Sequence, residues 1–155
     1  MAEGVAGRLK SMGIALPVPA APVASYVGFV RHGDLVFVSG QLPFVDGALT
    51  LTGLLGREVT LEQAAGQARI CAINVLAQVN LACDGDLERV EQCVRLGGFV
   101  ASTPDFTDHP KVINGASDLI GEVLREKGAH ARAAVGVAAL PLNACVEVEG
   151  LFALR

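Results

Sequence analysis

Two charged residues near the C-terminal end of the chain have the types and spacing that suit chemistry on a small carboxylate. Arg132 begins a predicted strand over residues 132–138, and Glu147 lies in a predicted strand over residues 144–153. The planar guanidinium of arginine donates two parallel hydrogen bonds to a carboxylate, and a nearby glutamate can orient water or exchange a proton. An ordinary ion pair between neighbouring strands would give the same spacing. Spacing alone favours the ion pair, and both interpretations stay open at this point.

A second group of candidate residues lies at the end of a predicted strand over residues 35–39. Ser39 and Gly40 stand where this strand stops. Glycine lets a ligand approach the backbone closely and a serine hydroxyl can donate to that ligand, although an ordinary turn explains the same pair. Tyr26 is the single tyrosine, and it packs either over a ligand or into the core. From the residues alone, the turn and the core are the simpler interpretations.

The cysteines and histidines show no spacing that is typical of a metal site. No C-x-x-C pair occurs among the four cysteines, which are Cys71, Cys83, Cys93 and Cys145. We therefore interpret them as buried small apolar residues in a reducing compartment. The three histidines share no ligand spacing, and we expect His32 and His109 on the solvated surface. Because the Gly-rich phosphate-binding motifs are also absent, the sequence predicts neither a metal nor a nucleotide cofactor.

The composition of the chain argues against several functional classes. The formal net charge is −4 and no basic run occurs, whereas nucleic-acid binders carry basic patches. Apolar residues make up 52% and charged residues 18% of the chain, a surplus that burial between subunits would cover. No apolar stretch reaches the roughly 18 residues that span a bilayer, and residues 1–22 lack the apolar core of a secretory signal. We expect an oligomeric cytoplasmic protein that binds neither nucleic acid nor a membrane.

The elements that would position the candidate residues follow from the periodicity of the apolar residues. A capping box at Thr60 and Gln63 predicts a helix that ends near Cys83. Further patterns predict a helix over 110–127 and strands over 26–31, 35–39, 90–101, 132–138 and 144–153. This order predicts an α+β fold with two helices on one face of a mixed sheet. We expect residues 1–22 to form an N-terminal arm with a short helix and residues 23–155 to form a single domain.

Two stretches of the chain resemble the signatures of a known family. Residues 38–43, VSGQLP, are similar to its S-G-Q-[IL]-P motif, and Tyr26 stands thirteen residues before Ser39, as the tyrosine of the family does. Residues 132–149, RAAVGVAALPLNACVEVE, resemble its C-terminal signature R-x-x-V-x-V-x-x-L-P-x-x-x-x-[VI]-E-[VI]-E. On these motifs the chain is identified as a member of the RidA, or YjgF-like, family of reactive-intermediate deaminases, also labelled endoribonuclease L-PSP. The resemblance runs from about residue 22 to residue 155.

The resemblance implies a fold, an assembly and an activity. The fold is chorismate-mutase-like, with a six-stranded mixed sheet, and three subunits pack their sheets into a central β-barrel with a cleft at each subunit interface. Family members hydrolyse enamines and imines to 2-oxo acids and ammonia without a metal or organic cofactor. By resemblance, Arg132 binds the substrate carboxylate, Glu147 positions water or relays a proton, and the cleft is lined by Tyr26, Ser39, Gly40 and Asn114.

The chain also departs from the best-known branch of the family. Ala134 stands where that branch has a cysteine, and the segment over residues 104–118 is longer. The stretch over residues 130–143 is similar to a less-studied branch, so the resemblance does not identify the substrate. Two alternatives to the deaminase stay open: a non-catalytic or regulatory trimer that binds small carboxylates, and an endoribonuclease, against which the acidic charge argues.

Overall fold

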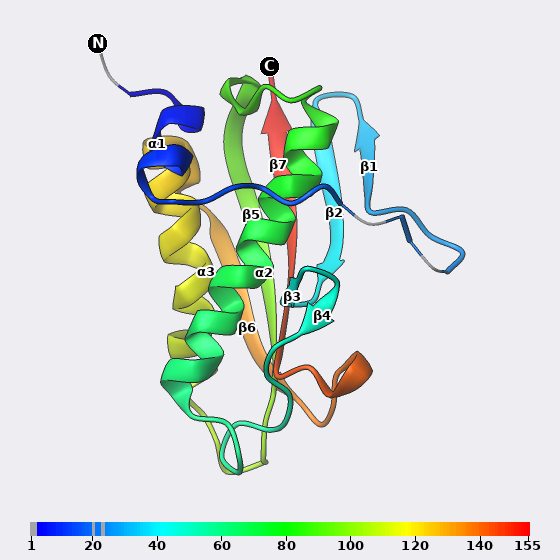
Figure 1. Cartoon of the computed structure of the whole chain (residues 1–155), viewed down its shortest axis with the longest axis vertical. Coiled ribbons are helices and arrows are strands. Elements are labelled where there is room, and N and C mark those ends of the chain that lie inside the picture. Colours follow the sequence, from blue (N-terminus) through cyan, green and yellow to red (C-terminus); the bar gives the residue numbers. More distant parts are fainter. Residues whose placement is uncertain (1–2, 20, 23) are drawn as a thin grey trace.

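The computed structural model describes residues 3–19, 21–22 and 24–155. Its α-helices are α1 (Val5–Ser11), α2 (Leu61–Ala82) and α3 (His109–Leu124), and short 3₁₀ helices are η1 (Leu87–Arg89), η2 (Arg125–Gly128) and η3 (Pro141–Asn143). The strands are β1 (Phe29–His32), β2 (Leu35–Gln41), β3 (Phe44–Val45), β4 (Ala48–Leu49), β5 (Val90–Ala101), β6 (Ala131–Val137) and β7 (Val146–Leu154). Figure 1 shows the long helices in front of the strands.

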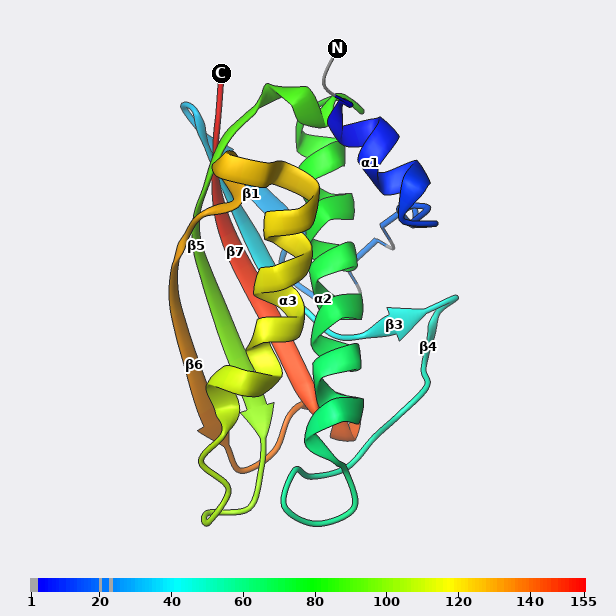
Figure 2. The ribbon, with the colours of Figure 1, turned by 90° about the vertical axis from the view of Figure 1, so that its left-hand side faces the viewer.

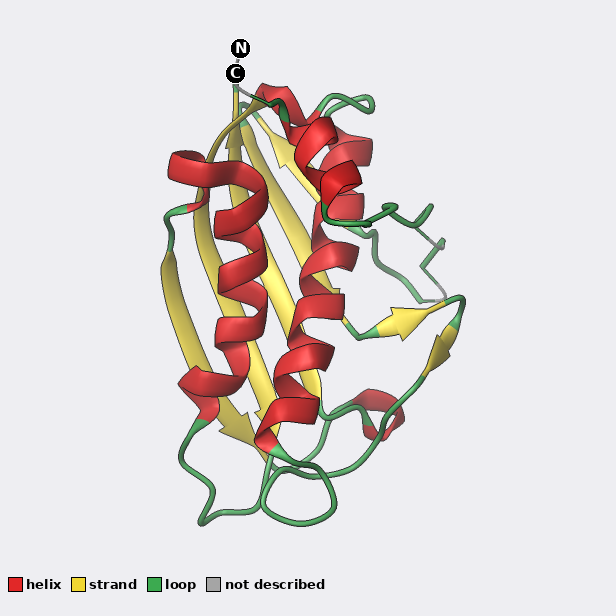
Figure 3. Cartoon of the chain, turned by 60° about the vertical axis from the view of Figure 1, so that its left-hand side comes forward, coloured by secondary structure: helices red, strands yellow, loops and turns green. Residues whose placement is uncertain are grey.

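Five strands form the main sheet, in the order β1-β2-β7-β5-β6. All neighbours are antiparallel except β5 and β6, which run parallel. Helices α2 and α3 lie side by side over one face of this sheet, as two separate views show (Figures 2 and 3). The predicted α+β class and the two helices on one face are therefore confirmed. In the described residues the opposite face of the sheet carries no helix.

The predicted strand count of six is wrong for the main sheet of the described chain. The residues after β2 turn away from the sheet and form the separate hairpin β3–β4, which is joined through Asp46 and Gly47. Both turn residues adopt positive φ angles, of 50° and 79°, which suits a tight hairpin. Asn74 of α2 holds this segment, because its Nδ2 donates to the carbonyl oxygens of Leu42 and Phe44.

The start of α2 and the pattern of β7 follow directly from the sequence. The Thr60 hydroxyl accepts from the backbone N–H of Gln63, whose side chain accepts from the N–H of Thr60, so the predicted capping box is present. Along β7 buried and partly buried residues alternate strictly from Val146 to Leu154. Because side chains of a strand point alternately to its two faces, Val148 and Phe152 face the helices, whereas Glu147 faces the uncovered side.

The core lies between the helical layer and the sheet. It contains apolar side chains of α2, α3, β2, β5 and β7, with the aromatic Phe152 the largest fully buried one. All four cysteines are buried and free, as the sequence predicts. Burial raises the pKa of the Cys93 thiol to about 12 and that of the Cys145 thiol to about 11. These thiols therefore stay protonated at neutral pH and act as apolar core groups.

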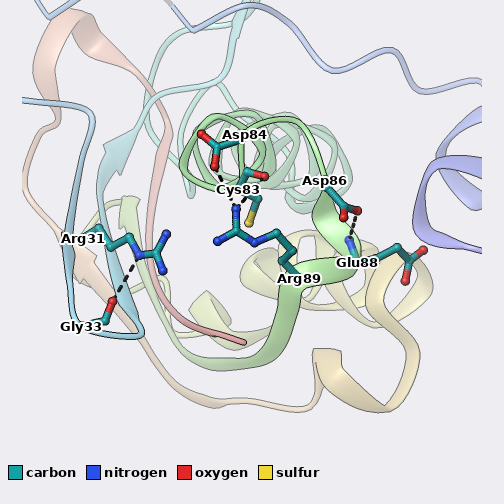
Figure 4. A network of polar contacts seen from close by, with 7 residues as sticks. All are labelled: Arg31, Gly33, Cys83, Asp84, Asp86, Glu88 and Arg89. Carbon is teal, nitrogen blue, oxygen red and sulfur yellow. Dashed lines mark hydrogen bonds and ion pairs between the residues drawn. The ribbon is translucent and has the colours of Figure 1, made fainter.

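Polar contacts fix the N-terminal helix and the turn between α2 and β5 at one end of the molecule. Glu88 accepts from the N–H of Val5, and Val5 and Leu9 are buried, so α1 packs onto the core. Arg89 Nη1 donates to the carbonyl of Cys83 and to the Asp84 carboxylate, and Asp86 accepts from the N–H of Glu88 (Figure 4). These contacts tie the end of α2 to the start of the central strand β5.

Candidate functional site

Arg132 lies on the edge strand β6 and points toward α3. Its Nη1 donates to Asn114 Oδ1 at 2.8 Å and to Ser117 Oγ at 3.1 Å, and its Nη2 donates to the carbonyl of Pro110 at 3.3 Å. A guanidinium carries five N–H donors, so two of them have no partner in the described residues. The partly buried side chain is thus held by three hydrogen bonds to α3 and still has two donors for a ligand.

The described residues place no carboxylate in an ion pair with Arg132. The ion pairs of the described chain involve other residues, such as Arg95 with Glu149 at 3.4 Å and Arg69 with Glu122 at 3.3 Å. The charge of Arg132 is balanced only by the neutral oxygens of Asn114, Ser117 and Pro110. Such a half-buried cation favours an anionic ligand, and the planar fork suits a carboxylate.

Arg132 and Glu147 do not meet within one chain. The prediction that they stand on neighbouring strands of one hairpin is wrong, because β5 lies between β6 and β7. In the register, Arg132 is opposite Leu96, which faces the helices, whereas Glu147 is opposite Phe99 on the other face. The two side chains therefore project from opposite faces of the sheet, and the cross-strand ion pair considered from the sequence does not form.

Glu147 lies on the uncovered face, next to Gly40. A Cβ atom at Gly40 would overlap the Glu147 carboxylate, so glycine at this position makes room for the acid. The carboxylate forms no hydrogen bond or ion pair with the residues of the described ranges. Burial raises the pKa of Glu147 above its ordinary value of 4.5, and the nearby charge of Glu149 raises it further. A carboxyl group with a raised pKa holds its proton more tightly than an ordinary glutamate does, which suits proton exchange.

Ser39 and Gly40 form a bulge in β2. The register with β7 shifts between Val38 and Gln41, which leaves one residue more on β2 than on its partner. Such bulges redirect backbone and side chains at sites. The Ser39 hydroxyl donates to the carbonyl of Val27 at 2.7 Å, so it ties the bulge to the segment that carries Tyr26. Tyr26 is 56% exposed, and the core interpretation of this residue is wrong for the isolated chain.

The predicted site residues thus fall into two groups on one chain. We call Arg132 with Asn114 the arginine half-site, which lies between β6 and α3. We call Tyr26, Ser39, Gly40 and Glu147 the glutamate half-site, which lies on β2, β7 and the segment before β1. The arginine half-site lies at the edge strand β6 and faces the helices, whereas the glutamate half-site lies on the uncovered face, over β2 and the middle strand β7.

The sequence did not identify Ser117 as a partner of Arg132, and the predicted place of His109 is wrong. Ser117 contacts the guanidinium directly, and its spacing of three residues from Asn114 on a helix was the available signal. The expectation for His109 is also wrong, because its Nε2 lies 3.0 Å from Ser102 Oγ and its ring packs edge-on against Phe106. His109 is partly buried because Gly136 leaves room for the imidazole, where a Cβ would overlap it.

Two hollows occur near these elements, and the larger one lies away from the predicted site residues. A pocket of about 470 Å³ lies between α1 and the end of α2. A smaller one of about 280 Å³ is lined by residues that include Ser102, His109 and Gly136. We give more weight to the smaller pocket, since Arg132 binds the carbonyl of Pro110, the residue that follows His109. Neither of these two pockets is lined by Arg132 or Glu147.

Two other kinds of site do not occur in the residues that the structure describes. No group of three or more histidine, cysteine or acidic side chains is arranged to hold a metal ion in that part of the chain. In the same ranges no helix is both long and apolar enough to cross a membrane.

The neutral form of Glu147 should stabilise the fold, which gives a testable dependence on pH. Because the pKa is raised in the folded state, the folded protein binds this proton more tightly than the unfolded chain does. The stabilising contribution is therefore complete below the ordinary pKa and is lost as the pH rises through the folded pKa. We expect Glu147→Gln to raise Tm at about pH 7 and to leave it unchanged below about pH 4. Thermal unfolding over this pH range measures the difference, and a lower Tm of the variant at neutral pH would contradict the account.

Comparison with known proteins places this geometry in a family. The model of the family described as "YjgF/chorismate_mutase-like, putative endoribonuclease" matches residues 6–154. The chain belongs to this YjgF-like family. The match includes most of α1, so it extends further toward the N-terminus than the resemblance seen in the sequence motifs.

Three proteins that are similar to this chain match most of its length. Protein TCP17 from Trypanosoma cruzi is 48% identical over 152 residues, which are 97% of this chain and 94% of the relative. The crystal structure of the protein Atu1372 from Agrobacterium tumefaciens, of unknown function, is 49% identical with a TM-score of 0.92 and covers 97% of this chain and 92% of that one. The YjgF gene product from E. coli is 23% identical with a TM-score of 0.65, covering 89% and 94% of the two chains, and it shares the fold.

Proposed function

We propose that the protein hydrolyses small enamines and imines that carry a carboxylate, releasing 2-oxo acids and ammonia. The observation that carries this proposal is the Arg132 guanidinium, which is held by Asn114 and Ser117, has no acidic partner in the described chain and keeps two donors free. A carboxylate group accepts two parallel hydrogen bonds from such a fork. The family resemblance of Arg132 supports the same role.

We propose further that three copies assemble so that the arginine half-site of one subunit meets the glutamate half-site of its neighbour. The uncovered face of the sheet supports an assembly, because it carries the apolar row Val30, Phe37 and Leu151, of which Phe37 is 48% exposed. Apolar side chains on an exposed sheet face favour burial against another subunit. The positions of the half-sites on opposite faces of the sheet suit a head-to-tail ring, which closes with three subunits in the family that the chain resembles.

In the proposed reaction, Arg132 fixes the substrate carboxylate and Glu147 of the neighbouring subunit faces the C=N carbon. An enamine first takes a proton from water on its terminal carbon, loses one from its nitrogen and becomes the imine. Water then adds its oxygen to the C=N carbon, and Glu147 accepts the proton that the water loses. Glu147 returns that proton to the nitrogen, which gives the carbinolamine. Glu147 then transfers the proton of the new hydroxyl to the same nitrogen as the C–N bond breaks, so ammonia leaves and the carbonyl of the 2-oxo acid forms. Orientation and charge complementarity provide the acceleration, since imines already react with water.

A coupled assay tests the proposed function. A pyridoxal-phosphate dehydratase and its amino-acid substrate generate the imine in solution, and the appearance of the 2-oxo acid is followed with and without the protein. We expect the protein to increase the rate at which the imine decays without changing the amount of imine that the dehydratase makes. Binding of 2-oxobutanoate without any acceleration would favour the alternative of a non-catalytic carboxylate-binding trimer. Cleavage of RNA would favour an endoribonuclease, against which the net charge of −4 argues.

A further inference from the structure

We propose that Ser117 and His130 are positioning residues that lock the orientation of the Arg132 guanidinium. This inference rests on the proposed function and adds two residues to its site. His130 Nδ1 lies 2.6 Å from the carbonyl oxygen of Gly128, and its Nε2 lies 2.8 Å from Ser117 Oγ. Ser117 Oγ in turn lies 3.1 Å from Arg132 Nη1. A continuous chain of hydrogen bonds therefore leads from a backbone carbonyl to the guanidinium.

With a neutral His130, the two ends of this series of hydrogen bonds fix the direction of each one. The carbonyl of Gly128 only accepts, so His130 Nδ1 carries the hydrogen that it donates. In the neutral imidazole Nε2 is then an acceptor, and the Ser117 hydroxyl donates to it. The oxygen of Ser117 keeps its lone pairs for Arg132, which only donates. All groups are satisfied in a single arrangement, and a reversed Ser117 hydroxyl would oppose the guanidinium.

The Gly128 end of this series of hydrogen bonds is anchored to α3. Gly128 is buried, and a Cβ at this position would lie 2.6 Å from the carbonyl oxygen of Ile120. This close approach holds the backbone of η2 against the end of α3. Ser117 belongs to α3 itself, whereas Gly128 belongs to η2, which packs against α3. Both partners of His130 are therefore held relative to the same helix. The imidazole therefore acts as a spacer of set length rather than as a mobile surface group.

The Arg132 end of this series of hydrogen bonds determines which donors of the guanidinium remain free. Ser117 and Asn114 together engage both hydrogens of Nη1, and Pro110 engages one hydrogen of Nη2. The two remaining donors are Nε–H and the second hydrogen of Nη2. Without Ser117, the guanidinium could rotate about its long side chain, and the carboxylate would bind only after the side chain is ordered. Ser117 and His130 thus act on the substrate through Arg132.

Steady-state kinetics distinguishes this role from a structural one. We expect Ser117→Ala to raise KM roughly 10-fold with little change in kcat, because the contact with the carboxylate is the same in substrate and transition state. Ser117→Thr keeps the hydroxyl and should restore most of the affinity. His130→Gln places an amide oxygen near the position of Nε2 and, like Ser117→Thr, should keep most of the affinity. His130→Phe has no acceptor there and should raise KM as Ser117→Ala does. An unchanged KM in Ser117→Ala, with an unchanged Tm, would overturn the inference.

Two further measurements separate the failure of this inference from the failure of the proposed function. The ¹⁵N resonances of the His130 ring in the wild-type protein should show a protonated Nδ1 and a bare Nε2, and Ser117→Ala should shift the Nε2 resonance. A protonated Nε2 with an unprotonated Nδ1 would overturn the proposed series of hydrogen bonds, whatever the measured activity. If the wild type binds 2-oxobutanoate in calorimetry but catalyses no hydrolysis, only the proposed function fails, and a weaker affinity in Ser117→Ala still supports the inference. Equal affinities of the two proteins overturn it.

Discussion

Replacing Arg132 by alanine is expected to lower kcat/KM for imine hydrolysis about 10²- to 10³-fold, which corresponds to about 3–4 kcal/mol. The variant loses the only cation that the described arginine half-site offers to a carboxylate. It also leaves the acceptors Asn114 and Ser117 without their shared donor. The coupled dehydratase assay measures the loss, with Tm and the size of the assembly as checks that the protein remains folded.

Arg132→Lys is the matched control for this prediction. Lysine keeps the positive charge, but it cannot serve Asn114, Ser117 and a carboxylate with a planar fork. We expect an activity between those of the wild type and Arg132→Ala. If Arg132→Ala retained wild-type kcat/KM, Arg132 would not bind the substrate, and the half-site would have another role.

Gly115→Ala is expected to destabilise the protein by about 2–3 kcal/mol and to lower its activity as well. A Cβ at Gly115 would overlap the carbonyl oxygen of Ala65 in α2, which is backbone and cannot turn aside. The two helices would have to separate, and the segment of α3 that carries Asn114 and Ser117 would move away from Arg132. Chemical denaturation measures the stability and the coupled assay measures the activity.

Gly121→Ala is the control within the same helix. A Cβ at Gly121 would meet no atom within 4 Å, and alanine favours the helix over glycine by about 0.5–1 kcal/mol. We expect this variant to be more stable than the wild type and fully active. If both substitutions had the same effect on the free energy of unfolding, close packing of α2 against α3 at Gly115 would not be what positions the site.

Local patterns were sufficient to predict most of the elements. The capping box at Thr60 and Gln63 fixes the start of α2, and the alternation of β7 shows which of its residues face the helices. Both signals are read within a few residues, where the geometry of helix and strand alone decides them. The class of fold followed from the order of these elements, and the motifs that begin at Val38 and Arg132 led to the family.

Long-range arrangement could not be read in the same way. The strands that carry Arg132 and Glu147 are consecutive in the sequence, which favours a hairpin, yet β5 enters the sheet between them. Nothing within residues 131–154 indicates this insertion, because it depends on pairing with residues 90–101. The contacts of Ser117 and His130 with one another depend on how α3 packs on β6, which is likewise set by tertiary structure.

The separation of Arg132 and Glu147 on opposite faces of one sheet leads to the central claim, that each site takes its arginine from one subunit and its glutamate from the next. Arg132→Ala and Glu147→Gln should each be nearly inactive as pure proteins. When the two are unfolded together and reassembled in equal amounts, about one quarter of the head-to-tail interfaces should contain both intact residues. The account predicts that the mixture recovers activity close to that fraction of the wild type. A mixture as inactive as its parents, with mixed assembly verified by mass spectrometry, would contradict it.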